Sequence, residues 1–504
     1  MTKVASTLID TRGRGGVSTD ASGKALPPDN EPPLQLYAKR KQIYPKLVYG
    51  KFRTWKWIIL FATLGIYYIL PWIRWERGPG ASDQAVLADF AGERFYFFWI
   101  EIWPQEVYYI TGLPILAALG LFLVTALFGR VWCGYTCPQT VWTDLFIAVE
   151  RLFEGDRNAR MRLDKQPLSF NKAWRKTGKH VVWLLVSFAT GGAFILYWRD
   201  APTLAQTFFV GEAPMSAYIF AGLLTATTYA LAGTMREQVC TYMCPWPRIQ
   251  AALIDKNTLA VTYRSERGDP RGPHKKGDTW EGRGDCIDCR QCVAVCPQGI
   301  DIRQGLQLEC IHCALCIDAC DAIMKKVDRA TGLIAYDTDE NVLLRWSGKA
   351  AAPFRMLRAR TALYVLVMLI VAGLMTFGLT TRSDLDLNVL KDRSLPFVRL
   401  SNGDIRNGYT VKVVNKAHEA RTLTIAVDGL DGAQLSVVGE SAADRGETAV
   451  RVEPDGVDRY RVLVTAPAGS LESDGSSRIR IRISDPESGA EQSNVVPFLG
   501  PESG

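Results

Sequence analysis

The stretch that decides the fold runs from residue 285 to 324, DCIDCRQCVAVCPQGIDIRQGLQLECIHCALCIDACDAIM, and holds eight of the chain's 12 cysteines. The first four follow the spacing C-x2-C-x2-C-x3-C and are Cys286, Cys289, Cys292 and Cys296. The second four repeat that spacing and are Cys310, Cys313, Cys316 and Cys320. This tandem spacing is typical of bacterial ferredoxins that carry two [4Fe-4S] clusters. The stretch therefore predicts a two-cluster ferredoxin domain.

In such ferredoxins the fourth cysteine of each run ligates the other cluster, so the spacing predicts crossed ligand sets. One cluster is expected on Cys286, Cys289, Cys292 and Cys320. The other is expected on Cys310, Cys313, Cys316 and Cys296. Disulfides are typical of small secreted domains and zinc of two separated C-x2-C pairs, so neither explains three cysteines in a row. One departure is Asp321, which follows Cys320 where Pro297 follows the first run.

The other four cysteines lie upstream, in the segments GRVWCGYTCPQTVW and MREQVCTYMCPWPR. They are Cys133, Cys137, Cys240 and Cys244. Both segments read C-x-Y-x-C-P, with an arginine (Arg130 or Arg236) shortly before the first cysteine. A spacing of four residues would place each pair on one helical face, although the following prolines disfavour helix at the second cysteine. The repetition predicts two related units whose four thiols converge.

The chemistry of these four thiols leaves several ligands open. Thiolates favour Cu(I), zinc or the iron of an iron-sulfur cluster, and Met243 adds a thioether. For any one of them the alternative is a buried cysteine that only packs. Haem is not expected, because the chain has four histidines and they do not pair across the apolar segments. One of them, His312, lies between two cluster cysteines and is expected beside the ligands or in solvent.

Five apolar stretches approach the length of about 20 residues that crosses a bilayer. They are 55–73, 107–128, 181–198, 215–234 and 361–379. Several are flanked by Trp or Tyr, which favour the headgroup level. At 504 residues, 48% apolar and 22% charged, the composition also indicates membrane spans alternating with soluble parts.

Lysines and arginines predict the orientation of these spans. They gather at 39–56, 130–179 and 355–360, which should therefore lie in the cytoplasm of a bacterial inner membrane. Five spans then place the N-terminus and the ferredoxin domain in the cytoplasm and the C-terminal tail in the periplasm. The net charge of +7 largely reports these flanking residues, so nucleic-acid binding is not expected.

The soluble ends of the chain differ in character. Residues 1–35 are rich in Gly, Pro, Ser and Asp without an apolar core, which predicts disorder. After Arg382, short runs such as YTVKVVN and SRIRIRISD alternate polar and apolar residues between turn signals, which predicts an immunoglobulin-like β-sandwich. The expected domains are 1–35 (disordered tail), 36–250 (four spans with both C-x3-C-P segments), 251–354 (ferredoxin), 355–381 (fifth span) and 382–504 (sandwich).

From about Leu36 onward the chain resembles the cytochrome c oxidase accessory protein family, known as FixG, CcoG or RdxA. The resemblance rests on IYPKLVYGKFR, PWIRW, GRVWCGYTCPQTVWTDLF, CTYMCPWPRIQ and CPQGIDIRQGLQLECIHCALCIDACD. It implies assistance in assembling a cbb3-type haem-copper oxidase, with reduction of Cu(II) to Cu(I). The implied partners are oxidase assembly factors or a copper chaperone or transporter, together with an unidentified electron donor.

Three functions remain open on the sequence alone. The favoured one is a cupric reductase in which Cys133, Cys137, Cys240 and Cys244 form the copper site, because Cu(I) prefers sulfur ligands. The second is a polyferredoxin relay to a quinone or a partner enzyme, suggested by a more distant similarity to the polyferredoxins of nitrate and nitrous-oxide respiration. The third is a non-enzymatic scaffold whose sandwich docks oxidase subunits and whose clusters only stabilise the fold.

Overall fold

The computed structural model describes residues 42–78, 81–90, 92–275, 277–392, 395–417, 419–440, 447–454, 456–471 and 475–501. The residues from Pro45 onward form one unit. The predicted disordered tail, 1–35, lies outside the described residues.

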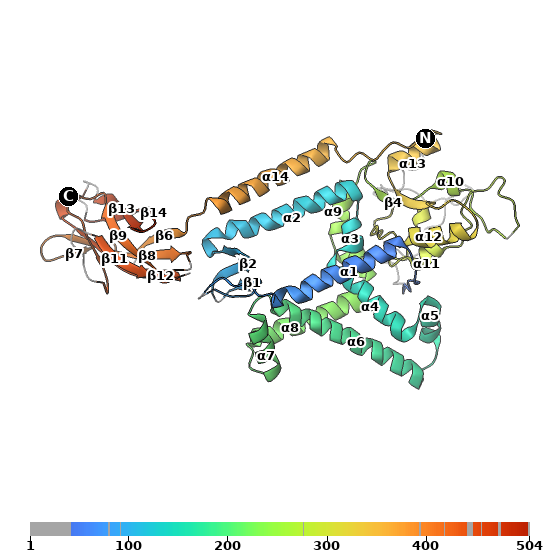
Figure 1. The fold of residues 1–504 in the computed structure, drawn as a ribbon, viewed down its shortest axis with the longest axis horizontal. Coiled ribbons are helices and arrows are strands. Elements are labelled where there is room, and N and C mark those ends of the chain that lie inside the picture. Colours follow the sequence, from blue (N-terminus) through green and yellow to red (C-terminus); the bar gives the residue numbers. More distant parts are fainter. Residues whose placement is uncertain are drawn as a thin grey trace, which may run out of the picture. The chain divides into compact units, whose positions relative to one another are not determined.

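Five helices of the described residues are long and apolar enough to cross a membrane, in agreement with the sequence. They are α1 with η2 (Lys51–Trp72), α2 (Val107–Phe128), α6 (Phe170–Ile195), α8 with the π-helical η4 (Met215–Met235) and α14 (Ala359–Thr380). Apolar side chains such as Leu363 and Leu366 of α14 point outward and are exposed. A bilayer would cover them, since lipid tails solvate apolar side chains while each helix satisfies its own backbone. In Figure 1, α14 runs alongside α2.

The third span begins earlier than its apolar stretch. Helix α6 starts at Phe170, where Ser169 accepts a hydrogen bond from the Lys172 amide at 3.3 Å, and the sequence placed this span at 181–198. The additional turns carry Lys172, Arg175, Lys176 and Lys179. Hydropathy detects only the apolar part of a helix that continues into a charged end.

Shorter helices follow the second and fourth spans. They are α3 (Val131–Tyr135), α4 (Pro138–Glu154), α5 (Arg157–Lys165), η5 (Val239–Met243) and α9 (Trp246–Leu253). Those after the second span lead to α6, and those after the fourth lead into the ferredoxin part. Gly129, with φ +61°, ends α2 and turns the chain into α3. Its left-handed conformation suits glycine, which has no Cβ to clash.

Buried ion pairs join α4, α5 and α6 beside the second C-x3-C-P segment. Glu150 of α4 contacts Arg160 at 3.1 Å and Arg236 at 2.7 Å, and Glu154 contacts Lys179 at 2.9 Å. All five side chains are buried. Part of the basic segment that predicts the orientation therefore also holds these helices together.

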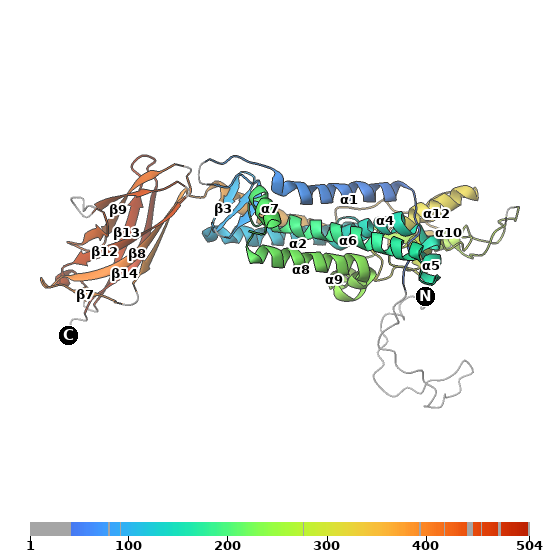
Figure 2. The same cartoon turned by 90° about the horizontal axis from the view of Figure 1, so that it is seen from below.

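The ferredoxin part is built around one short antiparallel pair, β4 (Ala260–Tyr263) with β5 (Ile334–Asp337). Its other elements are α10 (Ser265–Gly268), α11 (Gln291–Val295), η6 (Ile302–Gln304), α12 (Leu315–Lys326) and α13 (Asp339–Trp346). Asp318 of α12 accepts hydrogen bonds from the amides of Phe52 and Arg53 at 3.3 and 2.8 Å. The carboxylate thus caps the N-terminal end of α1, and Figure 2 shows α12 beside that end.

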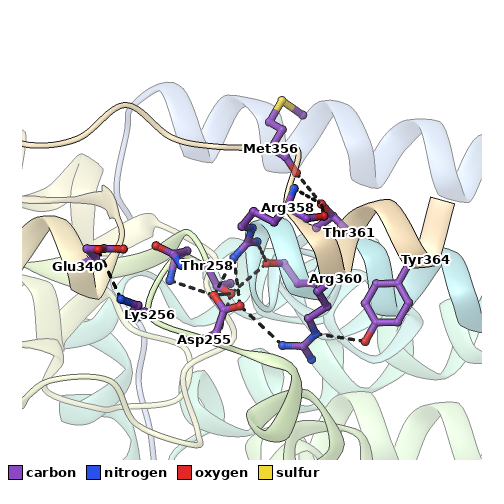
Figure 3. Close-up of polar contacts among 11 residues, drawn as sticks. Asp255, Lys256, Thr258, Glu340, Met356, Arg358, Arg360, Thr361 and Tyr364 are labelled. Atoms are coloured by element: carbon purple, nitrogen blue, oxygen red, sulfur yellow. Dashed lines mark hydrogen bonds and ion pairs between the residues drawn. The ribbon is translucent and has the colours of Figure 1, made fainter. Parts of the chain in front are cut away.

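Polar contacts also hold the start of α14 against the end of α2 (Figure 3). Arg358 bonds to both carboxylate oxygens of Asp255 at 2.8 and 3.1 Å and to the Ala126 carbonyl at 2.6 Å. Arg360 contacts the same carboxylate at 3.7 Å, and Thr258 donates to it at 3.0 Å. These contacts tie the fifth span to the loop that opens the ferredoxin part.

The C-terminal part is a sandwich of two antiparallel sheets, as the alternating pattern predicts. One has the order β10-β12-β8-β6, with β7 also paired to β8, and the other has the order β11-β9-β13-β14. Their strands are β6 (Leu385–Lys391), β7 (Val398–Arg399), β8 (Ile405–Asn415), β9 (Arg421–Asp428), β10 (Gln434–Val437), β11 (Glu447–Val452), β12 (Gly456–Ala466), β13 (Ser476–Ser484) and β14 (Glu491–Leu499). Inward residues such as Val411, Ile425 and Ile481 are buried between the sheets.

A small sheet between the first two spans was not predicted from the sequence. It contains β1 (Val86–Asp89), β2 (Arg94–Phe97) and β3 (Ile100–Ile102). Arg77 stabilises it by donating to the carbonyls of Gln84 and Phe98 at 2.9 and 2.8 Å. Strands of three or four residues are too short for their alternation to be recognised.

Candidate metal centres

The first cysteine-lined cavity, cavity A, lies between the first cysteine run and α12. Its cysteines are Cys286, Cys289, Cys292 and Cys320. The rest of the wall includes apolar side chains such as Met324 and Leu333 together with the polar Arg290 and Arg303, and the empty volume is about 360 Å³. The structure thus places the last cysteine of the second run with the first three of the first run.

The second cavity, cavity B, has the complementary set. Its wall includes Cys296, Cys310, Cys313 and Cys316, together with Cys292 at the border with cavity A. Ile300, Ile302 and Val261 close the remaining sides around an empty volume of about 360 Å³. The crossed grouping predicted from the spacing is therefore the grouping that the fold produces, and iron ligation by these residues remains a proposal.

The two cysteine runs share a backbone conformation that the sequence does not signal. Asp288 and Arg290 flank Cys289 with φ of 52°, and His312 and Ala314 flank Cys313 with φ of 51° and 59°. These left-handed residues lie within the loops whose first three cysteines line one cavity each. None of the four is glycine, so the turn depends on its surroundings rather than on residue type.

The chemistry of both cavities fits iron-sulfur clusters. Burial raises the pKa of Cys296 to about 12, with Cys313 adding to the effect, and burial likewise raises the pKa of Cys310 to about 12. Four thiolates in such a place require a cationic metal group to compensate their charge. In the part of the chain that the structure describes, no three His, Cys, Asp or Glu side chains converge as closely as a single metal ion requires. Four thiols spread around an apolar cavity suit a polynuclear cluster.

The four upstream cysteines belong to two segments that we call the first repeat (133–138) and the second repeat (240–245). The pairs do not share one continuous helical face, so that interpretation of the spacing is wrong. Cys133 lies in α3, whereas Cys137 precedes α4 with an extended ψ of 128°. Cys240 lies in the π-helix η5, whereas Cys244 follows it with ψ of 122°. Each following proline forces the residue before it out of helical geometry.

The two repeats lie side by side because contacts join them at both ends. Gln139 donates to the Leu231 carbonyl at 2.9 Å and to the Arg236 carbonyl at 3.3 Å. At the other end, Arg130 donates to the Pro247 carbonyl at 2.9 Å. Cys137 and Cys244, as well as Cys133 and Cys240, therefore face a common region.

The thiols of the two repeats influence one another electrostatically. Burial raises the pKa of Cys133 to about 12, and Cys137, Cys240 and Cys244 raise it further while Arg130 opposes them. Burial also raises the pKa of Cys240 to about 12, with Cys137 and Cys244 adding to the effect. All 12 cysteines of the chain are free thiols. The structure thus brings together the four cysteines that we call the four-thiol site, and copper binding there remains a prediction.

The first repeat is packed against cavity B. Cys133 belongs to a buried cluster with Ile311, Cys313 and Leu315. The Tyr135 hydroxyl donates to the Cys313 carbonyl at 3.2 Å. A Cβ on Gly134 would lie 2.6 Å from the Ile311 carbonyl oxygen, closer than real Cβ contacts. The tyrosine that both repeats share thus contacts a cluster loop in the first repeat.

Arg130 and His312 strengthen this junction; the sequence placed His312 beside the ligands or in solvent but did not indicate its contact with Arg130. The Arg130 guanidinium donates to the carbonyls of Leu308, Cys310 and Pro247. His312 is fully buried, and its Nδ1 accepts the Arg130 amide at 3.0 Å. Burial, with Arg130 adding to the effect, lowers the pKa of His312 to about 3. His312 therefore lies beside the ligand loop and not in solvent, and the arginine before the first repeat was the available signal.

Comparison with known proteins identifies the parts of the chain. Residues 235–339 match a family described as a 4Fe-4S dicluster domain, and residues 110–155 match a 4Fe-4S binding domain. Residues 375–501 match the IG-like fold at the C-terminus of FixG. With the cysteine-lined cavities and the five apolar helices, these matches define an iron-sulfur electron-transfer protein compatible with a membrane location.

Two curated relatives match most of the chain. Nitrogen fixation protein FixG of Rhizobium meliloti (strain 1021) is 51% identical over 461 residues, covering 86% of this chain and 88% of the relative. Protein RdxA of Cereibacter sphaeroides is 48% identical over 474 residues, covering 93% and 99%. The chain belongs to the FixG family. A crystal structure of a FixG-related protein from Vibrio parahaemolyticus is 22% identical, covers 23% of this chain and 97% of its own, and has a TM-score of 0.20.

Proposed function

We propose that the chain transfers single electrons from its ferredoxin part to Cu(II) at the four-thiol site, producing Cu(I) for assembly of a cbb3-type haem-copper oxidase. The observation that carries this proposal is the position of the two repeats. Cys133 belongs to the same buried cluster as Cys313 of cavity B, and Tyr135 donates to the Cys313 carbonyl, whereas Tyr242 and Met243 of the second repeat are 58% and 54% exposed. The repeats therefore connect a buried redox site with an exposed surface.

The chain's own residues support each part of this transfer. When bound, a [4Fe-4S] cluster supplies reversible one-electron redox chemistry. Most of the cysteines that line cavities A and B are buried or half-buried, and Arg130 and Tyr135 hold the first repeat against cavity B. At the exposed side, one electron converts Cu(II) to Cu(I), and sulfur ligands favour the reduced ion. The electron donor must be a one-electron reductant that reaches the ferredoxin part.

The alternative acceptor, a quinone, would need a large apolar cavity. A largely apolar cavity with an empty volume of about 1280 Å³ lies among α6, α7 (Ala201–Val210) and α8 and is lined by Phe194, Trp198 and Phe220. It adjoins the start of α8, whereas the second repeat follows the end of η4. The 21 residues between these ends correspond to about 30 Å of helix. A quinone in that cavity would be too far from the thiols for direct transfer.

The test of function uses the full chain in detergent under anaerobic conditions. Protein reduced with dithionite and freed of excess reductant is mixed with Cu(II) and a chelator specific for Cu(I). We expect the visible absorbance of the clusters to return in step with Cu(I) formation. Reoxidation by a quinone but not by Cu(II) would support the relay instead, and inert clusters would support the scaffold.

The orientation is a separate proposal that rests on the lysine and arginine distribution. We propose that the ferredoxin part faces the cytoplasm and the sandwich faces the periplasm of a bacterial inner membrane. Reporter fusions after Gly282 and after Gly403 should then report opposite sides. Both reporters on one side would contradict the five-span arrangement.

The partners are likewise proposed from this arrangement. A periplasmic sandwich is placed to dock oxidase assembly factors, and the exposed second repeat is placed to meet a copper chaperone or transporter. Crosslinking from Met243, replaced by a photoreactive residue, should capture such a copper protein in cells. Capture only by residues of the sandwich would favour the scaffold function.

A further inference from the structure

We infer that the cavity among α6, α7 and α8, here called cavity C, is a binding site for one phosphatidylethanolamine, a phospholipid whose head group contains a phosphate and an ammonium. Cavity C has an empty volume of about 1280 Å³ and a largely apolar wall that also contains two side chains of opposite charge, Asp89 and Arg199. It lies apart from the cysteine-lined cavities and the four-thiol site. The inference therefore goes beyond the proposed electron transfer and does not depend on copper being the acceptor.

Cavity C lies at the end of two membrane spans. Its wall includes Phe194 and Ile195, which end the third span, and Ser216, Ala217 and Phe220, which belong to the start of the fourth. In Figure 1, α7 and the small sheet lie at this same end of α6 and α8. A ligand in cavity C is thus placed where hydrocarbon gives way to head groups, which is the level at which a membrane lipid changes from apolar to polar.

Hydrogen bonds hold the small sheet against the connection between α6 and α7, so the cavity has a fixed wall. The buried Gln84 side chain donates to the Leu196 carbonyl at 2.8 Å and accepts from the Ala201 amide at 2.9 Å. The Ala88 amide of β1 donates to the Tyr197 carbonyl at 2.8 Å. The site is therefore formed by the fold before any ligand enters.

Aromatic rings form part of this wall. Phe90 stacks on Trp198 with ring centroids 5.1 Å apart and an angle of 5° between the ring planes, and the Phe194 ring lies 5.6 Å from the same indole. The Trp198 Nε1 is shielded from solvent and has no hydrogen-bond partner among the described residues. An unpaired buried donor costs about 1–3 kcal/mol. The ester carbonyl of a phospholipid can accept this hydrogen bond.

The positive groups of cavity C suit a phosphate. Arg199 lines the cavity, and the start of α8 lies in the same wall through Pro214, Ser216 and Ala217. Amides in the first turn of a helix lack partners within the helix and form the positive end of its dipole, where phosphate groups bind. The guanidinium offers a charge-assisted hydrogen bond to the same group. A quinone has no anionic group that would use these contacts.

The negative charge in the wall favours one kind of phospholipid. Asp89 accepts a hydrogen bond from the Gly92 amide at 3.0 Å. An ionised carboxylate has about four acceptor positions, so this bond leaves room for an ammonium group. Phosphatidylglycerol has only a negative charge, which Asp89 would repel. Phosphatidylethanolamine offers its phosphate to Arg199 and its ammonium to Asp89, and so fits both charges of the cavity.

Native mass spectrometry of the full chain, released from a mild detergent, tests the inference. Delipidated protein is incubated with equal amounts of phosphatidylethanolamine, phosphatidylglycerol and ubiquinone, which differ in mass. We expect one phosphatidylethanolamine per chain, retained about tenfold more than phosphatidylglycerol, as one favourable charged contact would give. Preferred retention of phosphatidylglycerol or ubiquinone, or no retained ligand, would overturn the inference.

Matched variants distinguish a lipid in cavity C from lipids that surround the spans. Ser216→Trp places an indole in the wall of cavity C. Met215→Trp adds the same ring one residue earlier, at a side chain that is 72% exposed and outside the cavity wall. We expect Ser216→Trp to lose the bound phosphatidylethanolamine and Met215→Trp to keep it. Equal retention by both variants would place the lipid elsewhere and overturn the inference.

Two further variants test the head group. Arg199→Gln should weaken binding of phosphatidylethanolamine about tenfold, and Asp89→Asn, which keeps an acceptor for Gly92, should remove the preference over phosphatidylglycerol. Elution volume and iron content equal to those of the parent establish that each variant folds. An unchanged preference in both variants would contradict the assigned contacts.

Thermal unfolding gives a second readout that needs no retained complex. A ligand that binds only the folded chain raises its melting temperature. Added phosphatidylethanolamine should therefore stabilise the delipidated parent and Met215→Trp, but not Ser216→Trp. Equal stabilisation of Ser216→Trp would show that the effect comes from the surrounding lipid and would overturn the inference.

Discussion

The two C-x3-C-P repeats have nearly the same sequence and very different surroundings. In the first repeat Cys133 and Tyr135 are buried, and Gly134 lies against the backbone of a cluster loop. In the second repeat Tyr242 and Met243 are exposed, and the helix is of the rarer π type. The first repeat therefore forms the buried side of the four-thiol site, and Tyr242 and Met243 of the second repeat lie on its exposed side.

The arginines that precede the repeats differ in the same way. Arg130 bonds to carbonyls of the ferredoxin part and of the second repeat, whereas Arg236 pairs with Glu150 of α4 and adopts a left-handed φ of 40°. One arginine joins the membrane helices to the clusters, and the other anchors the second repeat within the helices. The two repeats thus differ in their contacts although both carry a pair of thiols. Substitutions at equivalent positions of the two repeats test this difference in surroundings.

The largest effect is expected from the arginines. Arg236→Gln breaks a buried ion pair with Glu150. Because Glu150 keeps its ion pair with Arg160, we expect the loss of stability to be at the lower end for a broken buried pair, about 3 kcal/mol. Arg130→Gln should cost about 2 kcal/mol through its lost charge-assisted hydrogen bonds. Thermal unfolding in detergent measures both changes.

Only the Arg130 variant should alter redox behaviour. Removal of a buried cation disfavours the reduced, more negative cluster, so the midpoint potential of the cluster in cavity B should become lower. Potentiometric titration followed by EPR compares the two variants. An equal shift in Arg236→Gln would remove the distinction between the two arginines.

The next effect is expected at the residue after the first cysteine of each repeat. A Cβ on Gly134 would meet the Ile311 carbonyl oxygen at 2.6 Å and the Cys313 Cα at 3.0 Å. Gly134→Ala should therefore cost about 2 kcal/mol by overpacking and slow reoxidation of the clusters by Cu(II), with their iron retained. The equivalent change, Thr241→Ala, should be nearly neutral in unfolding and stopped-flow absorbance measurements. Normal kinetics in Gly134→Ala would show that this contact is not part of the transfer route.

A smaller difference is expected between the shared tyrosines. Tyr135→Phe removes the buried hydrogen bond to the Cys313 carbonyl at 3.2 Å and should cost about 1 kcal/mol. Tyr242, which is 58% exposed, should tolerate the same change without measurable loss. Denaturant or thermal midpoints of the two variants, compared with the parent, give the answer. A larger loss from Tyr242→Phe would indicate that a partner or the second repeat itself depends on that hydroxyl.

The smallest effect is expected in the pH dependence of stability. Burial would raise the pKa of Glu150, but Arg236, Arg160 and Lys179 hold it below its ordinary value. A lowered pKa means that the ion pair stabilises the fold above the ordinary glutamate pKa of about 4.3 and loses that contribution as the pH falls below it. The stability difference between the parent and Arg236→Gln should therefore be constant from pH 7 to about 5 and decrease at lower pH. The hydrogen-bond partners of the Arg130 guanidinium are carbonyls, which do not titrate, but Glu309 and His312 interact with its charge. The comparison is therefore between Arg236→Gln and the parent, with Glu150→Gln, which removes the titrating carboxylate itself, as the variant that should abolish the decrease.

The spacing of the cysteines and the periodicity of apolar residues were enough to predict the main parts of the fold. The crossed grouping of eight cysteines, the five apolar helices and the β-sandwich all follow from local patterns, because each depends on residues within a few turns or strands of one another. The convergence of the four upstream thiols was also predictable from the repeated motif. The helical face assumed for each pair was wrong, because the proline after the second cysteine controls its backbone more strongly than the spacing does.

Only the tertiary structure decided which repeat faces the clusters and which faces outward. Gly134 and Thr241 occupy equivalent positions in the sequence, and nothing local indicates that one of them must lack a Cβ. The contacts of Tyr135 with Cys313 and of Arg130 with Leu308 join residues 178 positions apart. Such contacts depend on how helices pack, and packing is a property of surfaces brought together by the whole chain rather than of any short pattern within it.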